Sequence, residues 1–290
     1  MTKEVICFYH GDMDGIAAAA IVNLKYPEAK FVRINYDSAV EKFSKIKFEE
    51  SKEYLIIIVD FSFDINIMSD IIKHYEVIWC DHHKSAKEKL LRFWKNMAVP
   101  GIRQLDYSGC ELTWMHFFPR IETPDVIKLI GDRDLWKFEY DGTKPFNERI
   151  HSVSNNPTDA IWILLLSNDK FVPNLIKQII AEGKILLEDK NRRVRKAFNN
   201  GLNMRFKNYK TKIINSGSDI SEIGHYTVDQ GYEIGLIWRQ VKDKFVCSLR
   251  SQKNIDVSAI AKEFGGGGHK NAAGISFESY DEMAKEIFII

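Results

Sequence analysis

The chain has 290 residues, 45% of them hydrophobic, so it holds enough apolar material for two domains of ordinary size rather than one. Its 41 basic residues almost balance its 40 acidic residues, which excludes a protein that holds long nucleic acid by overall charge. The four cysteines are scattered, which excludes a disulfide framework and a cysteine-based zinc site. No apolar run approaches the roughly 20 residues that cross a bilayer, and the start of the chain lacks the apolar region of a signal peptide. We therefore expect a cytoplasmic protein with no membrane partner.

Strands and helices alternate along the first half of the chain. Four short apolar runs, rich in β-branched residues, are typical of buried strands of a parallel sheet: residues 5–9, 31–34, 55–59 and 77–80. Between them, helices are predicted at 16–24, which is rich in alanine, and at 65–74, where apolar residues recur at helical spacing. This alternation predicts an α/β domain over residues 1–172, with a doubly wound and mainly parallel sheet.

Two further helices are expected after these strands, each with two candidate N-caps. Ser108 or Asp106 is suited to cap a helix that runs through Phe118, and Thr123 or Asp125 is suited to cap the next one. Side-chain oxygens of these residue types accept hydrogen bonds from the free amides of a first helical turn.

The second half of the chain begins with a long predicted helix over residues 173–199, apolar at its start and basic at its end. We interpret it as a helical linker with a solvated face, and substrate steering by the basic end is the alternative. Asparagine and glycine at 199–201 break it, and strands resume at 212–214, 232–239 and 245–249. A second, smaller α/β domain is therefore predicted over residues 200–290. It includes a helix that begins near Asp256 and ends at the glycine run 265–268.

Metal-binding residue types directly follow three of the predicted strands. They are His10, Asp12 and Asp14 after strand 5–9, Asp60 after strand 55–59, and Asp81, His82 and His83 after strand 77–80. The carboxyl ends of parallel strands share one edge of a sheet, so these side chains are expected to converge there. Carboxylates that converge repel each other unless a cation neutralises them, so the cluster predicts bound metal.

The ligand types narrow the choice of metal. Carboxylates mixed with imidazoles, without a thiolate, favour manganese, iron, cobalt or zinc over calcium, and oxygen-rich octahedral sites favour manganese or magnesium. Two ions bridged by one aspartate suit an in-line displacement at phosphorus, because the pair activates the attacking water and stabilises the leaving oxygen. We therefore expect two divalent ions, with Mn2+ preferred and Mg2+ or Co2+ as alternatives.

Four sequence segments follow one another in a recognisable order: HGDMDG at 10–15, VDFS at 59–62, DHH at 81–83 and GDRD at 131–134. They resemble the four successive motifs of the DHH phosphoesterase superfamily. A fifth segment, GGGGHKNAAG at 265–274, resembles the signature of the DHHA1 domain that accompanies this catalytic domain in one branch. The resemblance is closest to the oligoribonuclease and nucleotide phosphatase branch. It implies a metal-dependent phosphoesterase with its active site in the cleft between the two domains.

The resemblance also implies a role for each side chain of the cluster. Asp60 would bridge the two ions, and the remaining ligands form two sets: His10 and Asp12 for the first ion, and Asp14, His82 and Asp132 for the second. His83 would contact the substrate phosphate and help to protonate the leaving group, so His83 and Asp60 are the expected catalytic residues. Asp81 would orient a ligand imidazole through its other ring nitrogen. Asp134 either supports the site in the same way or replaces Asp132 as the ligand.

The glycine run of the second domain is a candidate substrate-binding loop. Successive glycines let the backbone approach a ligand closely and turn its N–H groups toward an anion, whereas a flexible linker is the reading that composition alone would give. The resemblance implies that Gly266, Gly267, Gly268 and His269 bind substrate together with Arg250 of the preceding strand. The planar fork of Arg250 suits bidentate binding of a phosphate.

These observations favour a phosphodiesterase or phosphatase that acts from an end on short oligonucleotides, dinucleotides or nucleotide phosphates. Hydrolysis of inorganic pyrophosphate or polyphosphate is the alternative, and the glycine loop with Arg250 argues against it because the pyrophosphatase branch carries a different C-terminal domain. A nucleotide sensor without catalysis is a third hypothesis, which the complete set of expected ligands disfavours. The physiological substrate, the polarity of cleavage, the metal used in the cell and the formation of a homodimer stay open.

Overall fold

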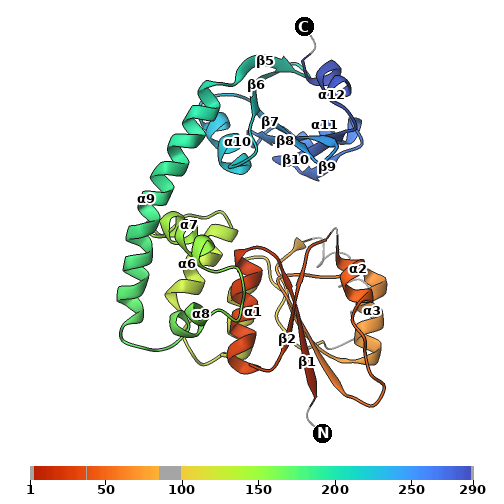
Figure 1. Cartoon of the computed structure of the whole chain (residues 1–290), viewed down its shortest axis with the longest axis vertical. Helices are drawn as coiled ribbons and strands as arrows, with labels where there is room; N and C mark the ends of the chain where they lie inside the picture. Colours follow the sequence, from red (N-terminus) through yellow and green to blue (C-terminus); the bar gives the residue numbers. More distant parts are fainter. Residues whose placement is uncertain (1–2, 37, 85–98, 289–290) are drawn as a thin grey trace. The chain divides into compact units, whose positions relative to one another are not determined.

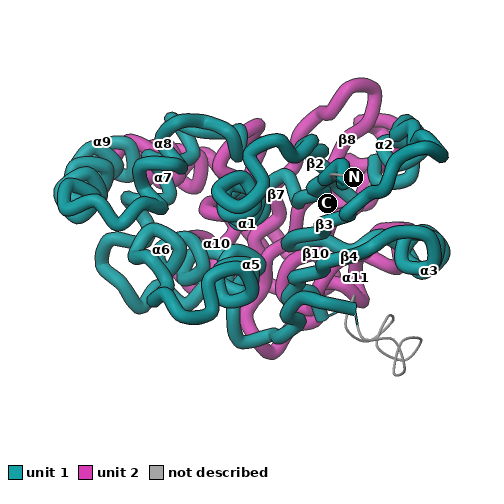
Figure 2. The backbone as a smooth tube through the Cα atoms, turned by 90° about the horizontal axis from the view of Figure 1, so that it is seen from below, with its two compact units in different colours: residues 1–187 teal, residues 188–290 magenta. Residues whose placement is uncertain are grey.

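In the computed structural model, residues 3–36, 38–84 and 99–288 are described. Contacts within the chain divide it into two units, Met1–Leu187 and Glu188–Ile290, which Figure 2 shows in teal and magenta. The division falls inside the long helix α9 (Val172–Asn199), which covers the segment predicted as a linker. None of the helices in the described ranges has both the length and the apolar character that crossing a bilayer requires.

The first unit is built on a four-stranded sheet in which every pair of neighbours is parallel. Its strands are β1 (Glu4–His10), β2 (Lys30–Ile34), β3 (Tyr54–Val59) and β4 (Glu76–Cys80), in the spatial order β2-β1-β3-β4. All residues of β3, one of the two central strands, are buried. This confirms the predicted parallel sheet, because only a strand covered on both faces is apolar throughout.

Helices cover both faces of this sheet (Figure 1). One face carries α2 (Ala39–Ser44) and α3 (Ile65–His74); the other carries α1 (Met13–Lys25), α5 (Gly109–Phe117), α6 (Asp125–Asp134), α7 (Thr143–Val153) and α8 (Ala160–Leu165). Alternate residues of a strand point to opposite faces, so Phe8 packs in the first core and its neighbours Cys7 and Tyr9 pack in the second. The doubly wound arrangement predicted from the sequence is confirmed.

The turn from β1 into α1 is tight and polar, and it positions the first candidate ligands. Asp12 is the N-cap of α1, and its side chain accepts a hydrogen bond from the Gly15 amide at 3.0 Å. A Cβ on Gly15 would lie 2.2 Å from the carbonyl oxygen of His10, so only glycine permits this turn. The alanines at 17–20 are buried, and their small side chains let α1 pack closely on the sheet.

The two predicted helix caps have different outcomes. Ser108 caps α5 as predicted, in a capping box with Glu111. The prediction of Thr123 or Asp125 as the cap of α6 is wrong, because Pro124 holds the N-cap position and makes no side-chain hydrogen bond there. Asp125 instead lies in the first turn, where its charge interacts favourably with the helix dipole.

The second unit is a smaller α/β fold with a six-stranded, mostly antiparallel sheet. The spatial order is β5-β6-β7-β8-β10-β9, and the bounds are β5 (Leu202–Phe206), β6 (Tyr209–Asn215), β7 (Ile234–Val241), β8 (Lys244–Ser251), β9 (Gly267–His269) and β10 (Ala272–Phe277). Helix α10 (Ile220–Asp229) packs on one face, and α11 (Val257–Glu263) and α12 (Tyr280–Ile287) pack on the other. As predicted, α11 begins after Asp256, whose side chain caps it.

Candidate metal centre

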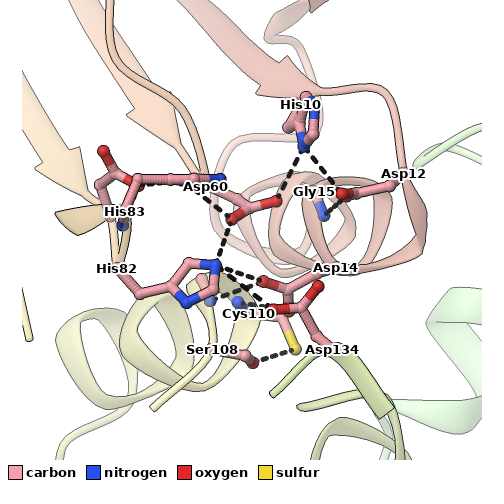
Figure 3. Close-up of polar contacts among 12 residues, drawn as sticks. His10, Asp12, Asp14, Gly15, Asp60, His82, His83, Ser108, Cys110 and Asp134 are labelled. Carbon is pink, nitrogen blue, oxygen red and sulfur yellow. Dashed lines mark hydrogen bonds and ion pairs between the residues drawn. The ribbon is translucent and has the colours of Figure 1, made fainter. Parts of the chain in front are cut away.

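Residues from four separate segments of the first unit converge at the carboxyl ends of β1, β3 and β4. Among the described residues, three overlapping groups could hold a metal ion, and within each group the ligand atoms all lie within 4.8 Å of one another. The groups are His10 with Asp12 and Asp60, Asp60 with His82 and His83, and Asp14 with His82 and Asp134. Asp60 belongs to two groups and His82 to two, so the three form one continuous cluster (Figure 3).

Asp60 lies at the centre of this cluster and is 1% exposed. His82 Nε2 lies 3.2 Å from its Oδ1, and His10 Nδ1 lies 3.6 Å from its Oδ2, yet neither oxygen accepts a hydrogen bond of good geometry from any residue that the structure describes. The backbone of Asp60 is left-handed, with φ +52°, a strained conformation for a residue other than glycine. Its amide donates to the carbonyl oxygen of Cys80 on the neighbouring strand at 2.8 Å. The fold therefore holds an unpartnered carboxylate in a strained conformation, which is typical of functional positions.

His10 and Asp12 form the outer part of the cluster. His10 Nδ1 lies 2.8 Å from Asp12 Oδ2. Burial lowers the pKa of His10. Hydrogen bonds to Asp12 and Asp60 and the negative charges of these two residues outweigh this effect and raise the pKa to about 10. The site thus favours a positive charge at this position, which a bound cation can supply in place of the proton.

Asp14, His82 and Asp134 form the inner part. The buried carboxylate of Asp14 accepts hydrogen bonds from the amides of Gly109 at 2.6 Å and Cys110 at 3.0 Å. His82 Nε2 lies 3.9 Å from Asp14 Oδ2 and 3.3 Å from Asp134 Oδ2. One imidazole nitrogen therefore faces carboxylates from two different helices.

The structure does not bring Asp132 into this cluster. Its buried carboxylate accepts hydrogen bonds from the amide of Glu139 at 2.9 Å, from the amide of Tyr140 at 3.3 Å and from the hydroxyl of Thr143. Residues two positions apart in a helix lie about 200° apart around its axis, so Asp132 and Asp134 point to nearly opposite sides of α6 and cannot face the same site. Of the two alternatives that the GDRD motif left open, this geometry favours Asp134.

Asp81 holds an imidazole in place, and that imidazole belongs to His83. Asp81 Oδ1 lies 2.8 Å from His83 Nδ1 and accepts a hydrogen bond from the His83 amide at 3.1 Å. The sequence-based expectation was that Asp81 would orient a metal-binding imidazole. His83 Nδ1 also lies 3.9 Å from Asp60 Oδ1, so His83 borders the cluster with its ring orientation fixed by Asp81.

Two features of the site were not predicted from the sequence. The ring of Tyr36 lies 5.8 Å from the ring of His10 and 5.9 Å from that of His83, with 52% of the residue exposed. Burial and the charges of Asp81 and Asp60 raise the pKa of its hydroxyl, which stays protonated. The second feature is the pair of amides at the start of α5 that bind Asp14; Ser108 carried a capping signal, but backbone donors leave no signal in a sequence.

Arg250 and His269 lie in one row across the sheet of the second unit. The strand register places Gly235, Arg250, Ala272 and His269 opposite one another on β7, β8, β10 and β9. Directly opposite residues of antiparallel strands point to the same face, so Arg250 and His269 share a face with only the methyl group of Ala272 between them. The guanidinium of Arg250 donates to Ser221 Oγ at 2.9 Å.

The glycine run is not the loop that the sequence predicted, because Gly267 and Gly268 form the edge strand β9 with His269. A Cβ on Gly266 would lie 2.2 Å from the carbonyl oxygen of Gly274, and one on Gly268 would lie 2.5 Å from that of Ala272. Close approach to β10 thus accounts for these two glycines. A Cβ on Gly267 would meet no atom within 4 Å, so this position alone of the three is open.

The donor set of the cluster fits divalent metal ions. It consists of carboxylates and imidazoles: Asp12, Asp14, Asp60, Asp134, His10, His82 and His83. Burial and then the charge of Asp14 raise the pKa of Asp60 well above its usual range, and the same two causes raise the pKa of Asp134 to about 8. Burial also raises the pKa of the nearby Cys110 thiol well above its usual range, so a thiolate is not among the donors. Carboxylates this close, with two unpartnered buried oxygens, require a cation or a proton to offset their repulsion.

The chain is similar in sequence to a known domain family and to two proteins. The sequence pattern of the DHHA1 domain matches residues 211–288, within the second unit. The chain is 27% identical over 295 residues to an uncharacterized protein of Acanthamoeba polyphaga mimivirus, covering 94% of this chain and 67% of that protein. It is 24% identical over 314 residues to the oligoribonuclease NrnB of Bacillus subtilis, covering 98% of this chain and 76% of NrnB.

Solved structures share the fold over nearly the full length. The DHH domain of a member of a family of ribosomal proteins has a TM-score of 0.65 and 17% identity, covering 98% of this chain and 85% of that one. Exonuclease RecJ bound to manganese has a TM-score of 0.54 and 14% identity over 95% and 86% of the two chains. The pGpG-specific phosphodiesterase PggH of Vibrio cholerae has a TM-score of 0.52 and 15% identity over 98% and 96%. Residues 211–288 therefore carry the pattern of a DHHA1 domain, and the similar sequences and folds, together with the metal-binding cluster, support the DHH/DHHA1 phosphoesterase superfamily for the whole chain.

Proposed function

We propose that this chain is a metal-dependent phosphoesterase that uses two divalent ions, preferably Mn2+, to hydrolyse short oligonucleotides, dinucleotides or nucleotide phosphates from an end. The observation that carries the proposal is the Asp60-centred cluster, in which the buried carboxylates of Asp14 and Asp60 and more exposed carboxylates and imidazoles from separate elements face one another without enough positive charge to offset them. A single bridging carboxylate with ligands on both sides is the arrangement that a two-ion site needs.

Each side of Asp60 offers a set of ligands for one ion. His10 and Asp12 would hold the first ion, and Asp14, His82 and Asp134 would hold the second, with Asp60 shared between them. The chemistry that such ions supply is Lewis-acid activation of water and of the phosphoryl group. The ligand oxygens and imidazoles favour Mn2+, with Mg2+ and Co2+ as the nearest alternatives.

We assign His83 to the substrate rather than to an ion, although its imidazole is also within reach of the Asp60 group of possible ligands. Its ring is fixed through Nδ1 by Asp81, which leaves Nε2 as the nitrogen that meets the substrate phosphate and gives a proton to the leaving oxygen. Because Asp81 is buried and its Oδ1 is bound to His83, the pair resembles the carboxylate–imidazole arrangement that sets the orientation of a proton donor.

The second unit is proposed to bind the substrate phosphate or terminal nucleotide through Arg250 and His269. The DHHA1 match over 211–288 and the shared row of these two residues support this role. Gly267, which is open on the edge strand, could admit a ligand close to the backbone. Gly266 and Gly268 have a packing role that is sufficient to account for them.

The named relatives support a short nucleic acid as substrate. NrnB is an oligoribonuclease, RecJ is an exonuclease that binds manganese, and PggH is a phosphodiesterase specific for pGpG. All three names describe cleavage of nucleic-acid phosphodiesters, which agrees with a cluster suited to phosphoryl chemistry.

The test is a substrate panel with the full chain after metal removal. A dinucleotide, a pentaribonucleotide, a nucleoside 3′,5′-bisphosphate, a cyclic dinucleotide and pyrophosphate are each incubated with Mn2+, Co2+ or Ca2+. We expect turnover of the linear nucleotide substrates with Mn2+ or Co2+ and little with Ca2+, whose larger, flexible coordination suits an imidazole-containing site poorly. Turnover of pyrophosphate alone would establish the inorganic alternative, and nucleotide binding without any turnover would establish a sensor.

A further inference from the structure

The amino terminus of α5 contacts the metal centre directly. Its first two amides, those of Gly109 and Cys110, donate to the two oxygens of Asp14 at 2.6 and 3.0 Å (Figure 3). These amides have no partner within their own helix, because the first turn lacks a preceding carbonyl. The positive end of the helix dipole also favours the negative charge of Asp14. Asp14 is therefore fixed by the backbone of a segment about 95 residues away in sequence.

Gly109 also determines how closely this helix approaches Asp60. A Cβ on Gly109 would lie 2.4 Å from Asp60 Cβ and 2.6 Å from Asp60 Oδ1, far inside the contact distance of carbon and oxygen atoms. Any other residue at this position would have to displace Asp60 or move α5 away. One residue thus contacts two candidate ligands, binding Asp14 through its amide and making room for Asp60 by lacking a side chain.

The cap of α5 connects the same segment to the helix that carries Asp134. The amide of Ser108 donates to Glu111 Oε2 at 2.9 Å, which closes the capping box. In α6, a Cβ on Gly131 would lie 2.6 Å from Glu111 Oε2 and 2.8 Å from Ser108 Oγ. Gly131 lies three residues before Asp134, on adjacent positions of one helical face, so the cap sets the distance at which α6 packs.

We propose that the α5 amino terminus, residues 108–111, is the positioning element of the metal centre and that Gly109 is its key positioning residue. This inference rests on the proposed function and deepens it, because it assigns the metal affinity of the site to a segment that supplies no ligand. The amides of this segment hold Asp14, and the absence of a side chain on Gly109 leaves room for Asp60. The packing of α6 against the α5 cap sets the position of Asp134.

The experiment measures metal binding rather than turnover. Manganese chloride is titrated by calorimetry into the metal-free full chain and into the Gly109→Ala variant, and the thermal unfolding of both metal-free proteins is recorded. Substitution of a residue that contacts a metal ligand typically lowers metal affinity about 10- to 100-fold. We therefore expect Gly109→Ala to bind manganese at least about tenfold more weakly than the unsubstituted chain. Gly217→Ala is the matched control, because a Cβ on Gly217 would meet no atom within 4 Å, and its manganese affinity should equal that of the unsubstituted chain.

A second pair of variants separates positioning from folding. Glu111→Ala removes the acceptor of the Ser108 amide, whereas Glu111→Gln keeps a side-chain oxygen for it. We expect weaker manganese binding in Glu111→Ala and its recovery in Glu111→Gln. If Gly109→Ala does not fold, the manganese affinities of Glu111→Ala and Glu111→Gln still test whether α5 positions the metal ligands.

The outcomes distinguish the inference from the function on which it rests. Equal manganese affinity in the unsubstituted chain, Gly109→Ala and Glu111→Ala, even with lower unfolding temperatures, would overturn the positioning role and leave α5 a structural helix. Failure of the unsubstituted chain to bind manganese at all would instead overturn the proposed function, and this inference with it.

Discussion

Asp60 combines burial, a left-handed backbone and two carboxylate oxygens without well-aligned hydrogen-bond donors. Each of these features lowers the stability of the metal-free fold: the backbone strain costs roughly 1–3 kcal/mol, and burial of a carboxyl group without hydrogen-bond partners adds to it. Such a loss of folding stability is tolerated at a cation-binding site, because binding of the cation to the folded state raises the free energy of unfolding again.

This cost leads to a prediction for Asp60→Asn. Asparagine tolerates the left-handed backbone and cannot acquire the negative charge that burial and Asp14 disfavour, so the metal-free variant should unfold about 2–6 °C higher than the metal-free parent. Its manganese affinity should fall by more than about tenfold. Thermal unfolding with a chelator and calorimetric titration check the two parts, with the exposed Asp70→Asn as control. A lower unfolding temperature for metal-free Asp60→Asn would show that its carboxylate stabilises the fold.

Asp132 and Asp134 provide a matched pair on one helix. Asp132 accepts three hydrogen bonds from residues 139–143, so Asp132→Asn should destabilise the first unit by about 1–3 kcal/mol while manganese affinity stays near that of the parent. Asp134→Asn should lower manganese affinity, because it removes a ligand carboxylate. It should leave the stability of the first unit nearly unchanged, because burial and the charge of Asp14 already raise the pKa of that carboxyl to about 8 and disfavour its charged form. Calorimetry and denaturant unfolding of both variants are the measurements. Loss of manganese binding in Asp132→Asn alone would return Asp132 to the ligand set.

At the level of elements, the carboxyl ends of β1, β3 and β4 explain why much of the site could be predicted. The strands are short and have apolar cores, so the sequence identifies them, and a parallel sheet brings the residues after them to one edge. The choice between Asp132 and Asp134 could not be made in this way, because it depends on how α6 is rotated about its axis. The contact of α5 with Asp14 could not be predicted either, because it is made by backbone amides.

The edge strand β9 shows a different kind of error. A run of four glycines is compatible with an anion-binding loop, a linker or a strand in tight contact with its neighbour, and composition does not separate these. In the structure the decisive contacts are those of Gly266 and Gly268 with β10, which are set by tertiary packing. Part of the predicted substrate loop is therefore explained by packing alone.

Packing and binding at this strand can be separated by substitution. Gly268→Ala should destabilise the second unit by roughly 1–3 kcal/mol, because its φ of +142° and the 2.5 Å approach to the Ala272 carbonyl exclude a side chain. Gly267→Ala should change stability little, since a Cβ there meets nothing within 4 Å. Unfolding curves of the two neighbouring variants provide the comparison. Equal stability of both would contradict the packing explanation.

At the scale of the whole molecule, we assign metal binding and hydrolysis to the first unit and substrate binding to the second. Arg250→Ala should leave manganese binding intact, because Arg250 lies in the second unit and the ligand cluster lies in the first. For a dinucleotide or pentaribonucleotide, losing a charge-assisted contact of roughly 1.5–3 kcal/mol should lower kcat/KM about 10- to 150-fold. A small activated phosphodiester, with no second phosphate or nucleotide to bind, should be affected far less.

The separate roles of the two units are tested by measuring kcat/KM for both substrates and the manganese content of Arg250→Ala and His269→Ala. Equal losses on the large and the small substrate would mean that the second unit supports the chemistry itself. Loss of bound manganese in either variant would mean the same.

The central claim is that Asp60 bridges two metal ions, and anomalous diffraction from crystals of the full chain grown with manganese tests it most directly. We predict two anomalous peaks about 3.5–4 Å apart, one on each side of the Asp60 carboxylate, with His10 and Asp12 next to one peak and Asp14, His82 and Asp134 next to the other. A single peak that does not contact Asp60, or no peak among these residues at saturating manganese, would contradict the account.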